Sequence, residues 1–71
     1  MINTAHVDNW FSYHAPDDAQ RLQYEAIRSS AKQLALVILA ATPESADQSA
    51  AMRKLRECVM TANAAVACKG H

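Results

Sequence analysis

The sequence predicts an all-α protein: an antiparallel two-helix hairpin with a short N-terminal aromatic segment or helix, assembled as a homo-oligomer. Three observations predict this architecture. Two long stretches without glycine or proline carry apolar residues at alternating steps of three and four, the spacing of one helix face. A short proline-containing stretch separates them, so the two helices should pack as antiparallel neighbours. Each helix is also apolar over more than one face, which leaves surface for further partners.

The N-terminal segment, residues 1–16, holds three of the four Trp, Tyr and Phe residues and ends at a proline. Trp10 and Phe11 suit a cap on the open end of the hairpin. Tyr13 carries a hydroxyl that requires a partner when it is buried, and it adjoins His14. Tyr13 is therefore better suited to a platform on which a flat ligand could stack.

The first long helix is expected over residues 17–41. Asp17, followed three residues later by Gln20, has the form of a capping box at a helix start. At about 1.5 Å per residue the helix would be about 37 Å long. Its expected seam toward the second helix consists of Tyr24, Ile27, Ala31, Leu34, Ile38 and Ala41.

The second long helix is expected over residues 45–68. Pro43 ends the first helix, and Ser45 with Gln48 repeats the capping-box pattern. Lys69, Gly70 and His71 end the helix with a cation and a glycine. The expected seam consists of Gln48, Met52, Leu55, Val59, Ala62 and Val66.

Self-association is expected from size and surplus apolar surface. A chain of 71 residues buries only about 60% of its unfolded surface, so a monomeric core would be marginal. Copies that cover each other's spare faces would supply the missing burial, although this argument does not choose between a dimer, a trimer and a hexamer. The spare apolar residues are Leu22, Ala26, Leu36 or Val37, and Ala40 in the first helix, and Ala51, Cys58 and Ala65 in the second.

Charge and composition exclude several classes of partner. Seven basic and seven acidic residues give a net charge of zero, which argues against binding to a DNA or RNA duplex. No apolar run is long enough for a membrane span, and the N-terminus lacks the features of a signal peptide, so a cytosolic protein is expected. Cys58 and Cys68 lie about 15 Å apart on different faces of one helix and are interpreted as structural thiols.

A polar stripe lies beside the apolar seam of the first helix and is one candidate for ligand binding. It consists of Arg21, Glu25, Arg28 and Lys32, at steps of four, three and four. One interpretation is a solvated face with an Arg21–Glu25 pair; the other is a set of cations, one or two turns into the helix, that reach phosphate oxygens beside a base stacked on Tyr13. Arg53, Lys54 and Arg56 form a similar cluster in the second helix, interpreted as solvated.

Catalysis is not expected. His6, His14 and His71 have no metal-ligand spacing, one glycine excludes a glycine-rich phosphate loop, and no nucleophile has an obvious base. The sequence therefore predicts a binding protein that is not an enzyme and has neither cofactor nor metal. Two alternatives stay open: a structural or protein-binding hairpin without a nucleotide ligand, and a phosphodiesterase that works from His14.

The chain resembles a family of small phage proteins that counter cyclic-oligonucleotide immunity, the anti-CBASS nucleotide sponges, whose hairpin is also similar to that of a phage anti-Thoeris sponge. The resemblance extends from about residue 10 to residue 67. It rests on YHAP at 13–16, on Gln20, Tyr24, Ile27 and Arg28, on AK at 31–32, and on PESADQSAAMRKLRECVMTANAAVA at 43–67.

This resemblance implies a homo-hexamer in the cytoplasm of the infected bacterial host that binds cyclic nucleotide messengers without cleaving them, so that the host effector is not activated. It implies cyclic dinucleotide sites between protomers, for ligands such as 3′,3′-cyclic GMP-AMP, and cyclic trinucleotide sites at threefold pores. The implied dinucleotide-binding residues are Tyr13, His14, Arg28 and Lys32. The implied trinucleotide-binding residues are Ser30, Asn63 and Lys69, with Cys68 standing where the family pattern has a basic residue.

Overall fold

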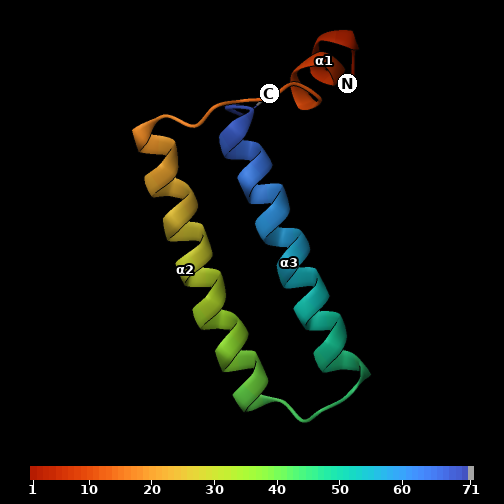
Figure 1. Ribbon diagram of the computed structural model, residues 1–71. Helices are drawn as coiled ribbons and strands as arrows, with labels where there is room; N and C mark the ends of the chain where they lie inside the picture. Colours follow the sequence, from red (N-terminus) through yellow and green to blue (C-terminus); the bar gives the residue numbers. More distant parts are fainter. Residues whose placement is uncertain (71) are drawn as a thin grey trace.

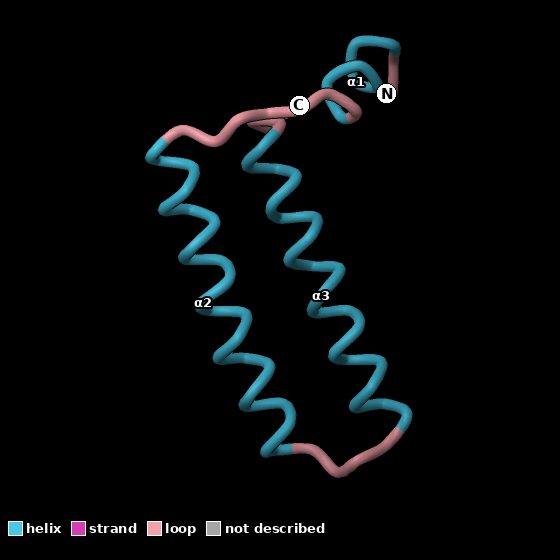
Figure 2. Tube along the Cα trace, in the orientation of Figure 1, coloured by secondary structure: helices cyan, strands magenta, loops and turns pink. Residues whose placement is uncertain are grey.

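The computed structural model describes residues 1–70 and contains three helices over that range, with no strand. They are α1 (Thr4–Trp10), α2 (Asp18–Ala41) and α3 (Ala46–Ala67). The long helices α2 and α3 lie side by side and run antiparallel, while α1 lies beyond the open end of this hairpin, on the side of α3 (Figure 1). Loops at 11–17 and 42–45 connect the helices (Figure 2). The predicted all-helical hairpin is confirmed.

α1 is held by a reciprocal cap at its N-terminus. The N–H of His6 donates to Oδ1 of Asn3 at 3.0 Å, and the N–H of Asn3 donates to Nδ1 of His6 at 3.1 Å. These bonds satisfy two amides that a seven-residue helix would otherwise leave to water. The His6 ring also stacks on Trp10, with 5.7 Å between ring centroids. The sequence had left open whether this segment is helical.

α2 begins with the capping box that its sequence predicts. The N–H of Gln20 donates to Oδ1 of Asp17 at 2.8 Å, and the N–H of Asp17 donates to Oε1 of Gln20 at 3.1 Å. The amide nitrogen of the same Gln20 side chain donates to the carbonyl of Val66 at 3.0 Å. One residue therefore caps α2 and also ties its start to the last turn of α3.

The predicted cap of α3 forms in one direction only. The N–H of Gln48 donates to Oγ of Ser45 at 3.1 Å, as a cap requires. The Gln48 side chain does not return to Ser45, because it donates to the carbonyl and to Oγ1 of Thr42, both at 3.1 Å. Gln48 thus bridges the turn and fixes the closed end of the hairpin.

The seam between α2 and α3 follows the expected periodicity with two corrections. All six seam residues expected in α3 are half-buried, and so are four of the six in α2. Leu34 instead is 49% exposed and Ala41 is also exposed, whereas Ala35 is half-buried in the seam. A step of either three or four from Ala31 is compatible with the helical period, and the path of α3 across α2 selects the step of four.

The isolated hairpin has no enclosed core. No residue among 1–70 is fully buried, and large apolar side chains on every element are exposed. Two helices that pack along one stripe can cover only the sides that face each other, so half-burial is the most this architecture gives a single copy.

α3 ends in a turn whose backbone requires left-handed conformations. The N–H of Gly70 donates to the carbonyl of Ala65 at 3.0 Å and the N–H of Lys69 to that of Val66 at 3.3 Å, the pair of bonds of a Schellman motif. Lys69 has φ 54° and Gly70 has φ 81°. A left-handed lysine is strained, because its Cβ crowds the backbone, whereas glycine is not. His71, which the sequence predicts to belong to this terminus, lies outside the described residues.

Opposite stability changes are expected at these two neighbours. Gly70→Ala should lower the free energy of unfolding by about 1 kcal/mol through backbone strain alone, since an added Cβ meets nothing within 4 Å. Lys69→Gly should raise it by about 0.5 kcal/mol, because relief of strain exceeds the added freedom of the unfolded chain. Urea unfolding at one fixed protein concentration measures both; a loss of stability in Lys69→Gly would contradict the left-handed turn.

Candidate functional site

Tyr13 and His14 lie in the loop between α1 and α2 but differ in their surroundings. The Tyr13 side chain is 88% exposed and has no hydrogen-bond partner among residues 1–70. His14 is half-buried, and its Nε2 lies 2.6 Å from the carbonyl oxygen of Asn9, to which it donates as the protonated ring nitrogen. His14 therefore holds the loop against the end of α1, while the Tyr13 ring presents its full face to solvent.

The cations of the α2 stripe are engaged to different degrees. Arg21 pairs with Asp18 at 3.0 Å, so the expected Arg21–Glu25 pair is wrong. Glu25 instead lies 3.7 Å from Arg28, and both side chains are largely exposed, so this pair contributes little to stability. Lys32 forms no ion pair within residues 1–70. Of the stripe, Lys32 is the cation that is free to meet an anionic ligand.

A single chain keeps Tyr13 apart from Arg28 and Lys32. The two cations lie ten and fourteen residues beyond the first residue of α2, which places them about 15 and 21 Å along its axis. This is about three and four turns into the helix, so the expectation of one or two turns is wrong. Tyr13 precedes the helix start. This separation disfavours a site in which one compact ligand touches the ring and Lys32 of the same copy.

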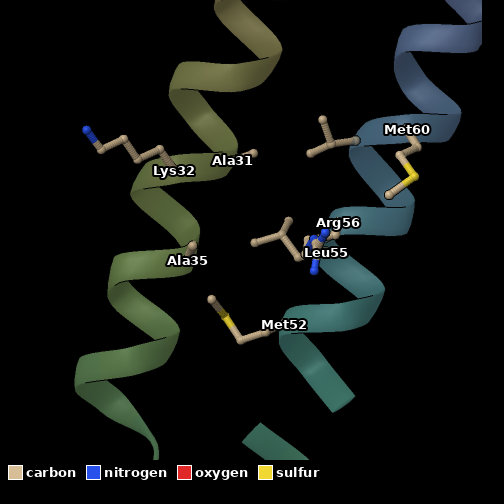
Figure 3. A pocket seen from close by; sticks show the side chains of 8 residues that line it. Ala31, Lys32, Ala35, Met52, Leu55, Arg56 and Met60 are labelled. Carbon is tan, nitrogen blue, oxygen red and sulfur yellow. The ribbon is translucent and has the colours of Figure 1, made fainter. Parts of the chain in front are cut away.

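Lys32 borders a groove of 340 Å³ between α2 and α3, about halfway along the hairpin (Figure 3). Ala31 and Ala35 leave space on the α2 side, and Met52 and Leu55 point across it from α3. The Lys32 side chain extends away from α3, so its aliphatic stem lines the groove and its ammonium stays outside. The remaining lining residues are Arg56, Val59 and Met60.

Arg56 is a charged groove residue that the sequence analysis does not assign to a site. The sequence pattern places it with Arg53 and Lys54 in a cluster that is interpreted as solvated. However, Arg56 follows the seam residue Leu55 directly, and in an antiparallel pair this position shares a flank with Lys32. The register of the two helices was the signal that could have identified it.

The residues implied for trinucleotide binding are spread over the molecule. Ser30 is exposed on α2 and, being two residues from Lys32, points about 160° away from it around the helix. Asn63 is half-buried on α3, and its Oδ1 is enclosed without a hydrogen-bond partner in the described chain. Lys69 is exposed in the left-handed turn after α3. One copy does not bring these three side chains together.

Residues 1–70 present neither a metal-ion site nor a membrane-spanning helix. No group of three or more His, Cys, Asp or Glu side chains is arranged to hold a metal ion. No helix in this range has the length and hydropathy needed to cross a bilayer. Cys58 and Cys68 are free thiols.

The fold and these surfaces define a small helical hairpin protein with an exposed tyrosine ring, a cationic stripe and apolar faces that a single copy leaves open. The family model described as Acb2/Tad1, hairpin domain, matches residues 3–67. The chain belongs to this family, which comprises phage anti-CBASS and anti-Thoeris sponge proteins. The resemblance noted from the sequence is thereby confirmed. No curated protein and no solved structure matches the chain.

Proposed function

We propose that this protein is a phage anti-defence sponge that binds and sequesters cyclic oligonucleotide messengers, such as 3′,3′-cyclic GMP-AMP, without cleaving them. Sequestration would lower the free messenger in the cytoplasm of the infected host, so that the CBASS effector stays inactive. The observation that carries the proposal is the exposed Tyr13 ring on a chain of this family. Such a ring can contribute about 1 to 3 kcal/mol by stacking on a base.

The proposed cyclic dinucleotide site is formed by residues from two copies of the chain. Tyr13 and His14 of one copy supply the ring and its support, and Arg28 and Lys32 of another supply contacts to the phosphates. Lys32 lies about 21 Å along α2 from the helix start, which Tyr13 precedes. This separation favours a site shared by two copies over a site within one chain. Charge-assisted hydrogen bonds from a few cations are sufficient for a ligand with two phosphates, which is compatible with the zero net charge of the chain.

The same reasoning supports a homo-oligomer, and we propose the hexamer that the resemblance implies. A hairpin without a fully buried residue gains its core by packing against copies of itself. Ser30, Asn63 and Lys69 would form the cyclic trinucleotide site where several copies meet. The enclosed Oδ1 of Asn63 supports this, since buried acceptors are rarely left without a donor.

Calorimetric titration with 3′,3′-cyclic GMP-AMP tests the proposal. We expect heat of binding, recovery of intact ligand after denaturation, and an increase in stability of about 2.7 kcal/mol at a ligand concentration a hundredfold above Kd. Cleaved ligand would instead indicate a phosphodiesterase. Absence of heat with every cyclic di- and trinucleotide would favour the protein-binding hairpin.

A further inference from the structure

The N-terminal arm, residues 1–16, carries an apolar edge that its own hairpin leaves uncovered. Phe11 is 85% exposed and Val7, four residues earlier, is 42% exposed. Side chains four residues apart along a helix lie on one face, so the two form a single edge at the end of α1. Asp8 lies one turn before Phe11, is exposed, and its carboxylate has no partner among residues 1–70.

The groove between α2 and α3 has the complementary character. Its floor is apolar and is made by Ala31, Ala35, Leu55 and neighbouring α3 side chains. Arg56 borders this floor and forms no ion pair within residues 1–70. A volume of 340 Å³ accommodates an aromatic side chain, and the alanines on α2 leave the space that it would fill.

Charge is distributed unevenly between these two surfaces. The arm contains Asp8 and neither Lys nor Arg, whereas the groove is bordered by the cations Lys32 and Arg56. Asp17 caps α2 and Asp18 pairs with Arg21, which leaves Asp8 as the unengaged acid of residues 1–18. Opposite charges on two surfaces guide their association and fix its register.

The arm does not reach the groove of its own copy. Arg56 lies eleven residues before the end of α3, about 16 Å below the open end of the hairpin, and α1 lies beyond that end (Figure 1). Each copy therefore offers one edge and one groove that do not meet. Two copies related by a twofold axis would satisfy both pairs at once.

We infer that Phe11 of one copy inserts into the α2–α3 groove of a second copy, with Asp8 beside Arg56 of that second copy. This inference rests on the proposed sponge function and deepens it. Phe11 would anchor the arm two residues before Tyr13, so that the Tyr13 ring reaches the Lys32 side of the second copy. The groove is thus the seat of an arm rather than the ligand pocket itself.

A charge-reversal cycle on the full chain tests this seat, with self-association measured by sedimentation over a dilution series. Asp8→Arg and Arg56→Asp should each weaken association about tenfold, and the double variant should recover most of the loss. Phe11→Ala should weaken association at least as much. Glu44→Arg, an acid reversed in the exposed turn at the closed end, is the matched control and should leave association unchanged.

Circular dichroism of every variant checks that the helices are retained. Failure of the double variant to recover association, or full association of Phe11→Ala, would overturn the inference. Calorimetry on the unaltered protein separates it from the proposed function. If the unaltered protein binds 3′,3′-cyclic GMP-AMP and Asp8→Arg associates normally, only the inference about the arm fails. If the unaltered protein neither binds this ligand nor associates, the inference and the proposed function both fail.

Discussion

Replacing Tyr13 by alanine is expected to weaken binding of 3′,3′-cyclic GMP-AMP by about ten- to a hundredfold. The ring would stack on a base, and loss of one such contact costs about 1 to 3 kcal/mol. The folded chain itself should be unaffected, because the side chain is 88% exposed and makes no hydrogen bond within residues 1–70. Calorimetry gives the affinity, and light scattering checks that the size of the assembly is unchanged.

Tyr13→Phe is the matched control, because it keeps the ring and removes only the hydroxyl. We expect it to retain affinity within about threefold, since stacking requires the π-face and not the oxygen. If phenylalanine and alanine reduced binding equally, the hydroxyl would be the contact. Full affinity in Tyr13→Ala would remove the ring from the site.

Helix identity could be predicted from the sequence because it depends on local periodicity and caps. Spacing alone predicts the six seam residues of α3 and the capping box between Asp17 and Gln20. Leu34 was misassigned because both three and four residues complete a turn from Ala31, and hydropathy favours the larger side chain. Packing across the seam, which depends on α3, places Ala35 there.

Side-chain partners were less predictable where a residue has more than one acceptor or donor within reach. Gln48 could return to Ser45 or cross the turn to Thr42, and only the turn geometry decides between them. Arg21 could pair with an acid three residues before it or four residues after it. Such choices involve differences of a few tenths of a kcal/mol, which a sequence pattern does not resolve.

The candidate site could be predicted by residue type but not by arrangement. Tyr13 and Lys32 stand out in the sequence as a ring and a cation, and their separation along the axis follows from the expected helix start, whereas the packing of copies that would join them does not. Arg56 was missed because its sequence neighbours are also basic, which hides its place beside the seam. A site that depends on a second copy leaves only half its geometry in one chain.

Among the cations, Lys32→Gln is expected to lower the affinity for 3′,3′-cyclic GMP-AMP by tenfold or more. A hydrogen bond to a charged group contributes about 1.5 to 3 kcal/mol, and Lys32 has no competing ion pair within residues 1–70. Arg28→Gln should have a smaller effect, because Glu25 already lies 3.7 Å from its guanidinium. Calorimetry at two salt concentrations should also show a weaker salt dependence for Lys32→Gln.

Two further variants separate a specific phosphate contact from general attraction. Arg21→Gln removes the same charge from the same stripe, but at the open end and from a residue paired with Asp18, so it should change affinity less than threefold. Glu25→Gln releases Arg28 and should raise affinity by a few-fold if that guanidinium binds phosphate. Equal losses in Arg21→Gln and Lys32→Gln would mean that only net charge attracts the ligand. The expected loss of affinity decreases in the order Lys32, Arg28, Arg21. This order follows from how far ion pairs within α2 already neutralise each cation.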